Sequence, residues 1–203
     1  MFAVLSRFAG GGRSAAAPCY SSAMPQEWDG CVTPVVAWAI GSAGEWYPEH
    51  VGLPLHSGFY MLEVHYDNPA MRRLVDSSGL RLHLTSRPRH FDGAVLSAGV
   101  AVSPLHVVPP RQPSFKSVGL CGSACTSATL PEGGVRVVSV VLHSHTAGRS
   151  LLLRHVRGGK ELPPLAADPH YDFRFQQARR LQREATLLPG KALALTVSRE
   201  GAP

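Results

Sequence analysis

Two histidines in this sequence have the spacing of metal ligands. His143 and His145 follow an apolar run that begins at Val135, and they are two positions apart. Residues two positions apart on an extended strand project from the same face, so both imidazoles can reach one cation. Pairs of imidazoles suit zinc, copper, iron or nickel. The alternative is that both are ordinary surface histidines, since the sequence contains ten.

A third histidine, His65, ends another short apolar segment, and Glu63 precedes it by two positions. The segment alternates between a core-like face and a second face, and the first consists of Tyr60, Leu62, Val64 and Tyr66. We therefore expect Glu63 and His65 to project together from the second face. Taken alone, His65 fits a hydrogen-bonded edge residue better than a ligand.

The four cysteines are Cys19, Cys31, Cys121 and Cys125. Four cysteines allow three pairings, and the sequence does not choose among them. Cys121 and Cys125 precede the His-x-His pair, but that histidine spacing is too short for a zinc finger. The cysteines are better explained by disulfides in an oxidising compartment.

The elements that position these residues are predicted to be short strands. The sequence has 20 glycines and 17 prolines, which separate short segments rich in valine and leucine. This pattern is typical of an all-β sandwich or barrel. The predicted strands cover 35–40, 60–66, 80–85, 94–102, 135–143, 151–157 and 192–197. By composition, one segment could form a helix, 175–186.

Charge and hydropathy exclude several classes of protein. The net charge is +6, but the basic residues are scattered and the aromatic residues, 7% of the chain, do not alternate with them. This argues against a nucleic-acid partner. No apolar run approaches the roughly 20 residues that cross a bilayer, so no transmembrane segment is expected. The first residues are interrupted by Arg7 and glycines, so they predict a disordered leader and no signal peptide.

Longer stretches of the sequence resemble the copper type II, ascorbate-dependent monooxygenases, in the branch that contains dopamine beta-hydroxylase and the DBH-like monooxygenases. The resemblance runs from about Cys19 to Thr196. The segments that carry it include Phe59-Tyr60-Met61-Leu62-Glu63-Val64-His65-Tyr66-Asp67-Asn68-Pro69, Leu142-His143-Ser144-His145-Thr146-Ala147-Gly148-Arg149, and His170-Tyr171-Asp172-Phe173 with Phe175-Gln176.

The resemblance implies an all-β fold of two antiparallel, jelly-roll-like β-sandwich domains, each incomplete in this chain and each associated with one copper. It implies that His65 is one ligand of the first copper and that His143 and His145 are ligands of the second. No catalytic residue is implied beyond these ligands. The implied substrates are a small aromatic amine, such as a catecholamine precursor, and O2. Ascorbate would be the electron donor, and the secretory pathway or the extracellular space would be the location.

The domain organisation implied by the resemblance has four parts. Residues 1–18 form the disordered leader, and 19–69 form the C-terminal part of the first copper-binding sandwich. Residues 70–78 form a linker, and 79–203 form the N-terminal part of the second sandwich.

The sequence also departs from the family pattern. The His-His-Met motif that supplies the other ligands of the first copper is absent. The four methionines all lie before residue 72, where none can serve the second copper. Peptide-amidating relatives have an arginine two residues before the first histidine, where this chain has Val141, which argues against a substrate carboxylate. The resemblance pairs Cys19, Cys31, Cys121 and Cys125 with cysteines outside the chain.

We therefore expect an internal fragment that is inactive alone and exposes sheet edges able to associate with a second copy. Two alternatives stay open. One is a secreted binding or interaction module that lacks a complete copper pair, and the other is a fragment that holds a metal weakly through two histidines.

Overall fold

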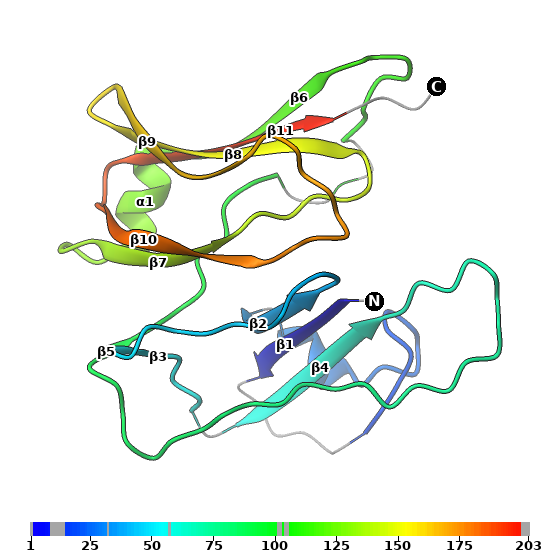
Figure 1. Cartoon of the computed structure of the whole chain (residues 1–203). Helices are drawn as coiled ribbons and strands as arrows, with labels where there is room; N and C mark the ends of the chain where they lie inside the picture. The colour runs from blue at the N-terminus through cyan, green and yellow to red at the C-terminus, as the bar shows by residue number, and fades with distance from the viewer. Residues whose placement is uncertain are drawn as a thin grey trace. The chain divides into compact units, whose positions relative to one another are not determined.

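The computed structural model describes residues 2–8, 15–31, 33–56, 58–100, 103 and 106–199. For residues 2–8 only the backbone is described. The chain forms two compact units, which Figure 1 shows. Unit 1 comprises Met1–Trp38 and Trp46–Val95, and unit 2 comprises Ala39–Glu45 and Leu96–Pro203. The last segment of unit 1 ends at Val95, and the last segment of unit 2 begins at Leu96. Residues 70–78, expected to form a linker, lie within unit 1.

Unit 1 contains a three-stranded sheet in the order β2-β1-β4. Its strands are β1 (Phe2–Phe8), β2 (Thr33–Ala39) and β4 (Phe59–His65). Strand β1 pairs antiparallel with β4 from Phe2 opposite His65 to Phe8 opposite Phe59. The unit also has a short 3-10 helix, η1 (Gln26–Gly30), and a parallel pair formed by β3 (Val51–Gly52) and β5 (Phe91–Asp92).

The prediction of a disordered leader over 1–18 is wrong for Phe2–Phe8, which form the central strand of this sheet. The local signals, namely Arg7 and the glycines that follow, do not indicate a strand. A short segment rich in aromatic and aliphatic residues becomes a strand when a distant partner supplies its hydrogen bonds, and β4 is that partner here.

Unit 2 is built from two antiparallel sheets, which Figure 1 shows stacked with a short helix at one end. The larger sheet has the order β6-β11-β8-β9, and its strands are β6 (Phe115–Cys121), β11 (Ala192–Arg199), β8 (Gly148–Arg157) and β9 (Lys160–Asp168). The smaller sheet pairs β10 (Ala178–Leu187) with β7 (Val135–Val141). The helix is α1 (Ser123–Thr129). The all-β, sandwich-like fold class is therefore confirmed.

The hydrophobic core of unit 2 takes side chains from both sheets. Strand β6 shows the alternation, because Ser117 and Cys121 are buried whereas Val118 and Leu120 are exposed. The buried cluster consists of Cys121, Val140, Leu142, Leu151, Leu165, Tyr171, Leu187, Leu193 and Val197. Two of its members, Leu142 and Tyr171, flank the candidate metal ligands described below, so the core and the site share residues.

Most of the predicted strands are confirmed. Strands β2, β4, β7, β8 and β11 cover the segments expected at 35–40, 60–66, 135–143, 151–157 and 192–197, with shifts of a few residues at their ends. The strand predicted at 80–85 is irregular, as are residues 94–100 of the strand predicted at 94–102; residues 101–102 lie outside the described residues. Strands β6 and β9 and helix α1 were not predicted.

The helix predicted at 175–186 is wrong, because Ala178–Leu187 form strand β10. The segment is rich in Gln, Arg, Ala and Leu, which have good helix propensity. Its backbone instead pairs with β7 across an irregular register between Arg180 and Ala185, and Leu187 is buried completely. Tertiary pairing outweighs a propensity difference of about 0.7 kcal/mol per residue at most.

The cysteines differ from the pattern that the resemblance implied. Cys121 and Cys125 form a disulfide with each other, across a Cα–Cα distance of 5.3 Å, rather than with partners beyond the chain. The physical reason is local, since α1 begins two residues after β6 ends and brings Cys125 back toward Cys121. Cys19 and Cys31 are free thiols in this structure. Within the described part of the chain, no helix is long and apolar enough to cross a membrane.

Replacing Leu187 by alanine should lower the free energy of unfolding by about 2–5 kcal/mol, because this side chain is 0% exposed in the core. Chemical denaturation measures the change. The matched control is Leu120→Ala, whose side chain is 69% exposed and should change the value by no more than about 0.5 kcal/mol. Equal effects of the two substitutions would contradict the core assignment.

Candidate metal centres

His143 and His145 lie on an extended segment that continues past the end of β7. Leu142 and Ser144 are buried, with 4% and 5% of their surface exposed. His143, which lies between them, and His145, which follows Ser144, are exposed. The alternation places both imidazoles on the same face, as the spacing predicts. Their ring centroids are 5.3 Å apart and the planes are nearly perpendicular, at 77°. Two nitrogen donors from one short segment therefore lie close together.

The Tyr171 hydroxyl holds the residue between these histidines. It donates a hydrogen bond to the Ser144 carbonyl oxygen at 2.6 Å and accepts one from the Ser144 N–H at 2.9 Å. The backbone N–H of Tyr171 in turn donates to the carbonyl of Arg149 at 2.9 Å. Burial raises the pKa of Tyr171 and the bond to Ser144 opposes that rise, while Asp168 and Asp172 add to it. The phenol is therefore protonated and able to donate at neutral pH.

A tight turn follows the second histidine and requires glycine at position 148. The N–H of Gly148 donates to the carbonyl of His145 at 2.9 Å, and strand β8 begins at this residue. A Cβ at this position would lie 2.6 Å from the Ser144 hydroxyl oxygen. Such a contact is far closer than van der Waals packing allows, so the return of the chain beside Ser144 depends on the missing side chain.

Gln176 orients the first histidine of the pair. Its amide Nε2 donates to the Phe173 carbonyl at 2.7 Å, so its Oε1 is the atom that faces His143 Nδ1 at 2.5 Å. An amide oxygen only accepts, so His143 carries its proton on Nδ1. The Nε2 lone pair is then left for a cation, the arrangement usual for metal-binding histidines.

The second histidine is held in its neutral form. Partial burial lowers the pKa of His145, and its electrostatic interactions with His143 and Arg199 lower it further. Only a neutral imidazole has a lone pair to offer to a metal. Both histidines therefore present the chemistry of ligands, and the donor set of two imidazoles fits copper, zinc or another imidazole-binding metal.

His65 ends strand β4 in unit 1 and projects beside Glu63, as the alternation predicts. His65 Nε2 contacts Glu63 Oε1, and the Tyr20 hydroxyl donates to the same oxygen at 2.7 Å. Burial raises the pKa of Glu63, but the bonds from Tyr20 and His65 and the charge of His65 outweigh it, so the pKa is lowered overall. The carboxylate is thus ionised at neutral pH.

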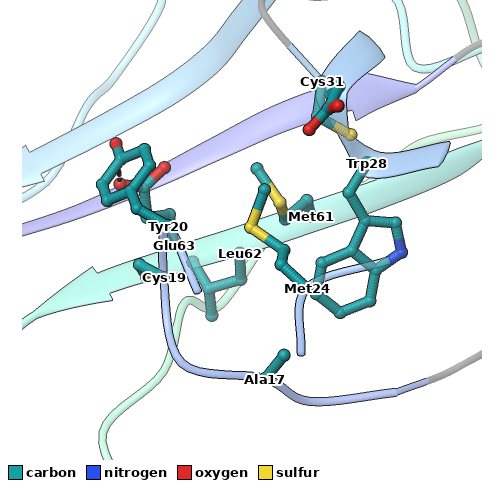
Figure 2. A pocket seen from close by; sticks show the side chains of 10 residues that line it. Ala17, Cys19, Tyr20, Met24, Trp28, Cys31, Met61, Leu62 and Glu63 are labelled. Carbon is teal, nitrogen blue, oxygen red and sulfur yellow. Dashed lines mark hydrogen bonds between the residues drawn. The ribbon is translucent and has the colours of Figure 1, made fainter. Parts of the chain in front are cut away.

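Beside this group lies a pocket, which Figure 2 shows from close by. One part of its lining consists of Cys19, Tyr20 and Glu63, the residue that His65 contacts. Thioether and indole surface comes from Met24, Met61 and Trp28. Its remaining lining residues are Ala17, Asp29, Cys31 and Leu62. The pocket combines sulfur, apolar and carboxylate groups within unit 1.

The structure brings His143 and His145 together and places His65 with Glu63 and Cys19. Sequence reasoning gave no role to Tyr171, Gln176 or Tyr20. The first two lie in the segment 170–176 that resembles the family, so the resemblance pointed at the segment without indicating its contacts. Their bonds to the histidine segment span 27 and 33 residues, and no local pattern reveals such contacts.

Comparisons with known proteins identify the family of this chain. The copper type II ascorbate-dependent monooxygenase C-terminal domain matches residues 91–201, and the N-terminal domain of the same family matches residues 9–73. The chain therefore belongs to the copper type II ascorbate-dependent monooxygenase family. His65 falls in the N-terminal match, and His143 and His145 fall in the C-terminal match.

Several curated proteins are similar over most of this chain. MOXD1 homolog 1 of Drosophila melanogaster is 44% identical over 193 residues, which is 93% of this chain and 28% of that protein. DBH-like monooxygenase protein 1 of Mus musculus is 45% identical over 86% of this chain and 30% of its own length. Human dopamine beta-hydroxylase is 35% identical over 87% of this chain and 29% of its own length. The chain thus spans less than a third of each relative.

Removing the Tyr171 hydroxyl by Tyr171→Phe should cost about 1–3 kcal/mol of unfolding free energy, because the buried N–H and C=O of Ser144 lose their partner. Hydrogen exchange at the Ser144 amide should also become faster. The matched control is Tyr66→Phe, whose hydroxyl bonds Asp76 at an exposed position and should cost no more than about 0.5 kcal/mol. Unchanged stability and exchange in Tyr171→Phe would show that the hydroxyl does not hold this segment.

Proposed function

We propose that this chain takes part in a copper-dependent monooxygenase reaction in which a small aromatic amine is hydroxylated with O2, and ascorbate supplies the electrons. The observation that carries the proposal is the pair His143 and His145, exposed on one face and fixed by Tyr171 and Gln176. When copper is bound, it supplies the redox chemistry that passes electrons from ascorbate to dioxygen.

The proposed roles of the three histidines are supported by their positions within the two family matches. His143 and His145 would hold the second copper, which belongs to the C-terminal domain. His65 would be a ligand of the first copper, in the N-terminal domain. Gln176 keeps the proton of His143 on Nδ1, and Tyr171 fixes the backbone between the two imidazoles, so their positions are set before a metal arrives. This preorganisation reduces the reorganisation that metal binding requires.

The substrate class is argued from the relatives and from one position of this chain. Relatives include proteins named dopamine beta-hydroxylase and DBH-like monooxygenase. Val141, two residues before His143, is 48% exposed and apolar. It offers no charge to a substrate carboxylate. A phenethylamine therefore fits the proposal better than a peptide with a free C-terminus.

The proposed location is the secretory pathway or the extracellular space. The Cys121–Cys125 disulfide supports it, because disulfides persist in oxidising compartments and are rare in the cytosol.

Either substitution, His143→Ala or His145→Ala, should lower the copper affinity of unit 2. Loss of a hydrogen-bond partner of a metal ligand typically lowers metal affinity roughly 10–100-fold, and loss of the ligand itself should lower it more. Copper content after dialysis, measured by mass spectrometry, tests this. The matched control is His170→Ala, an exposed histidine in the same unit, which should leave the copper content unchanged.

Consumption of O2 and ascorbate in the presence of tyramine or dopamine, measured on the copper-loaded protein, tests the reaction itself. Coupled consumption that depends on His143 and His145 supports the proposal. Copper bound at the pair without any turnover would favour a metal-binding module. A copper content that is the same in the double variant as in the unsubstituted chain would overturn the ligand assignment.

A further inference from the structure

Most of the net charge of this chain lies in one exposed segment of unit 1. Residues 71–90 contain five arginines and one aspartate, which gives +4 of the total net charge of +6. Every residue of the segment except Leu80 is exposed, and none belongs to a helix or strand. Figure 1 shows it within the long stretch that joins β4 to β5. The arginines are Arg72, Arg73, Arg81, Arg87 and Arg89.

The beginning of this segment, residues 71–75, combines two arginines with apolar side chains that are almost fully exposed. Met71 is 91% exposed, Leu74 is 67% exposed and Val75 is 97% exposed. The two arginines lie between Met71 and Leu74 and are exposed as well. A single exposed leucine is common on a protein surface, but three large apolar side chains within five residues indicate a surface that contacts a partner.

Hydrogen bonds from Asn68 hold the backbone of the 71–75 loop. The Asn68 side chain donates to the Arg72 carbonyl at 2.8 Å and accepts from the Arg72 N–H at 3.1 Å. The N–H of Met71 donates to the Asn68 carbonyl at 3.0 Å. Met71 has a φ of 47°, in the left-handed region that residues other than glycine rarely adopt. Such a conformation persists where surrounding bonds hold it, so the loop presents its side chains from a defined turn.

A second set of bonds closes the base of the loop and engages the one acidic residue of the segment. The hydroxyl of Tyr66, the residue after β4, donates to Asp76 Oδ2 at 2.8 Å. Ser78 donates to the same carboxylate through its hydroxyl at 2.7 Å and through its N–H at 3.0 Å. Within the described part of the chain, neither Arg72 nor Arg73 forms an ion pair. Both guanidinium groups are therefore available to an anionic partner.

We propose that the 71–75 loop binds a membrane surface that carries anionic phospholipid headgroups. Its two arginines bind lipid phosphates, because a guanidinium matches a phosphate in bidentate geometry. Its three apolar side chains enter the boundary between headgroups and acyl chains, where apolar surface leaves water. The other arginines of residues 71–90 add to the attraction toward a negatively charged surface.

The mixture of charge and apolar surface favours a membrane over a soluble polyanion. A nucleic acid or a sulfated polysaccharide attracts arginines, but it gives no apolar environment to Leu74 and Val75. Proteins that bind single-stranded nucleic acids also stack bases on aromatic side chains, and residues 71–90 contain no Phe, Tyr or Trp. A lipid surface is the partner that accounts for both kinds of side chain.

This surface is separate from the proposed copper sites. It contains none of His65, His143 and His145, and the bonds that hold it begin at Tyr66 and Asn68. Membrane binding can therefore be measured without copper, and failure of either proposal leaves the other standing.

Sedimentation of the whole chain with phospholipid vesicles tests the proposal. We expect the chain to sediment with vesicles of phosphatidylcholine and phosphatidylserine, and much less with vesicles of phosphatidylcholine alone. Arg72→Gln with Arg73→Gln should weaken binding to the first kind roughly 25-fold, since each arginine near an anionic surface contributes about a fivefold factor. Leu74→Ser with Val75→Ser should weaken it about tenfold or more, because the apolar contact is lost.

Matched controls remove the same kinds of side chain at exposed positions of unit 2. Arg180→Gln with Arg183→Gln removes two arginines from β10, and Val118→Ser with Leu120→Ser removes a valine and a leucine from β6. Both controls should bind vesicles as the unsubstituted chain does. Equal losses in the loop variants and the controls, or equal binding to the two kinds of vesicle, would overturn the proposal. Binding that needs the loop arginines but not its apolar side chains would also overturn it, in favour of a soluble polyanion.

Discussion

The two hydrogen bonds between the Tyr171 hydroxyl and the backbone of Ser144 are the interaction on which the candidate copper pair depends. Ser144 lies between two exposed imidazoles and past the end of β7, and the pairing of β7 with β10 ends at Val141. A buried peptide group without a partner is costly, so a phenol that both donates and accepts stabilises an extended conformation there. That conformation puts His143 and His145 on the same face.

The same segment is coupled to the core of unit 2. Leu142 precedes the pair and packs in the cluster that contains Tyr171, Val140 and Leu151. The alternation that turns Leu142 and Ser144 inward turns the histidines outward. Packing, backbone hydrogen bonding and the exposure of the two imidazoles thus follow from a single periodic pattern. Gly148 allows the chain to pass close beside Ser144, where a side chain would clash.

Unit 1 depends on a long-range pairing of another kind. Strand β1 lies at the centre of its sheet and fixes β4, the strand that carries Glu63 and His65. The side chains gathered around His65 are a thiol, a carboxylate and a phenol. The chemistry available to one histidine is set by the neighbours that the fold supplies.

The sequence by itself determined the all-β class, the strands around both histidine segments, and the shared faces of His143 with His145 and of Glu63 with His65. These features follow from alternation between adjacent residues, which is local. The resemblance carried by segments such as 142–149 and 170–176 extended this to the family, and the domain comparisons confirmed it.

Only the tertiary structure decided the role of Phe2–Phe8 as a central strand, the strand at Ala178–Leu187 and the contacts of Tyr171, Gln176 and Cys19. Each of these depends on partners tens of residues away, and the pairing energy of a distant strand or a buried hydrogen bond outweighs local propensity. The disulfide between Cys121 and Cys125 belongs with them despite its short span, because helix α1, which the composition did not indicate, brings the two sulfur atoms together.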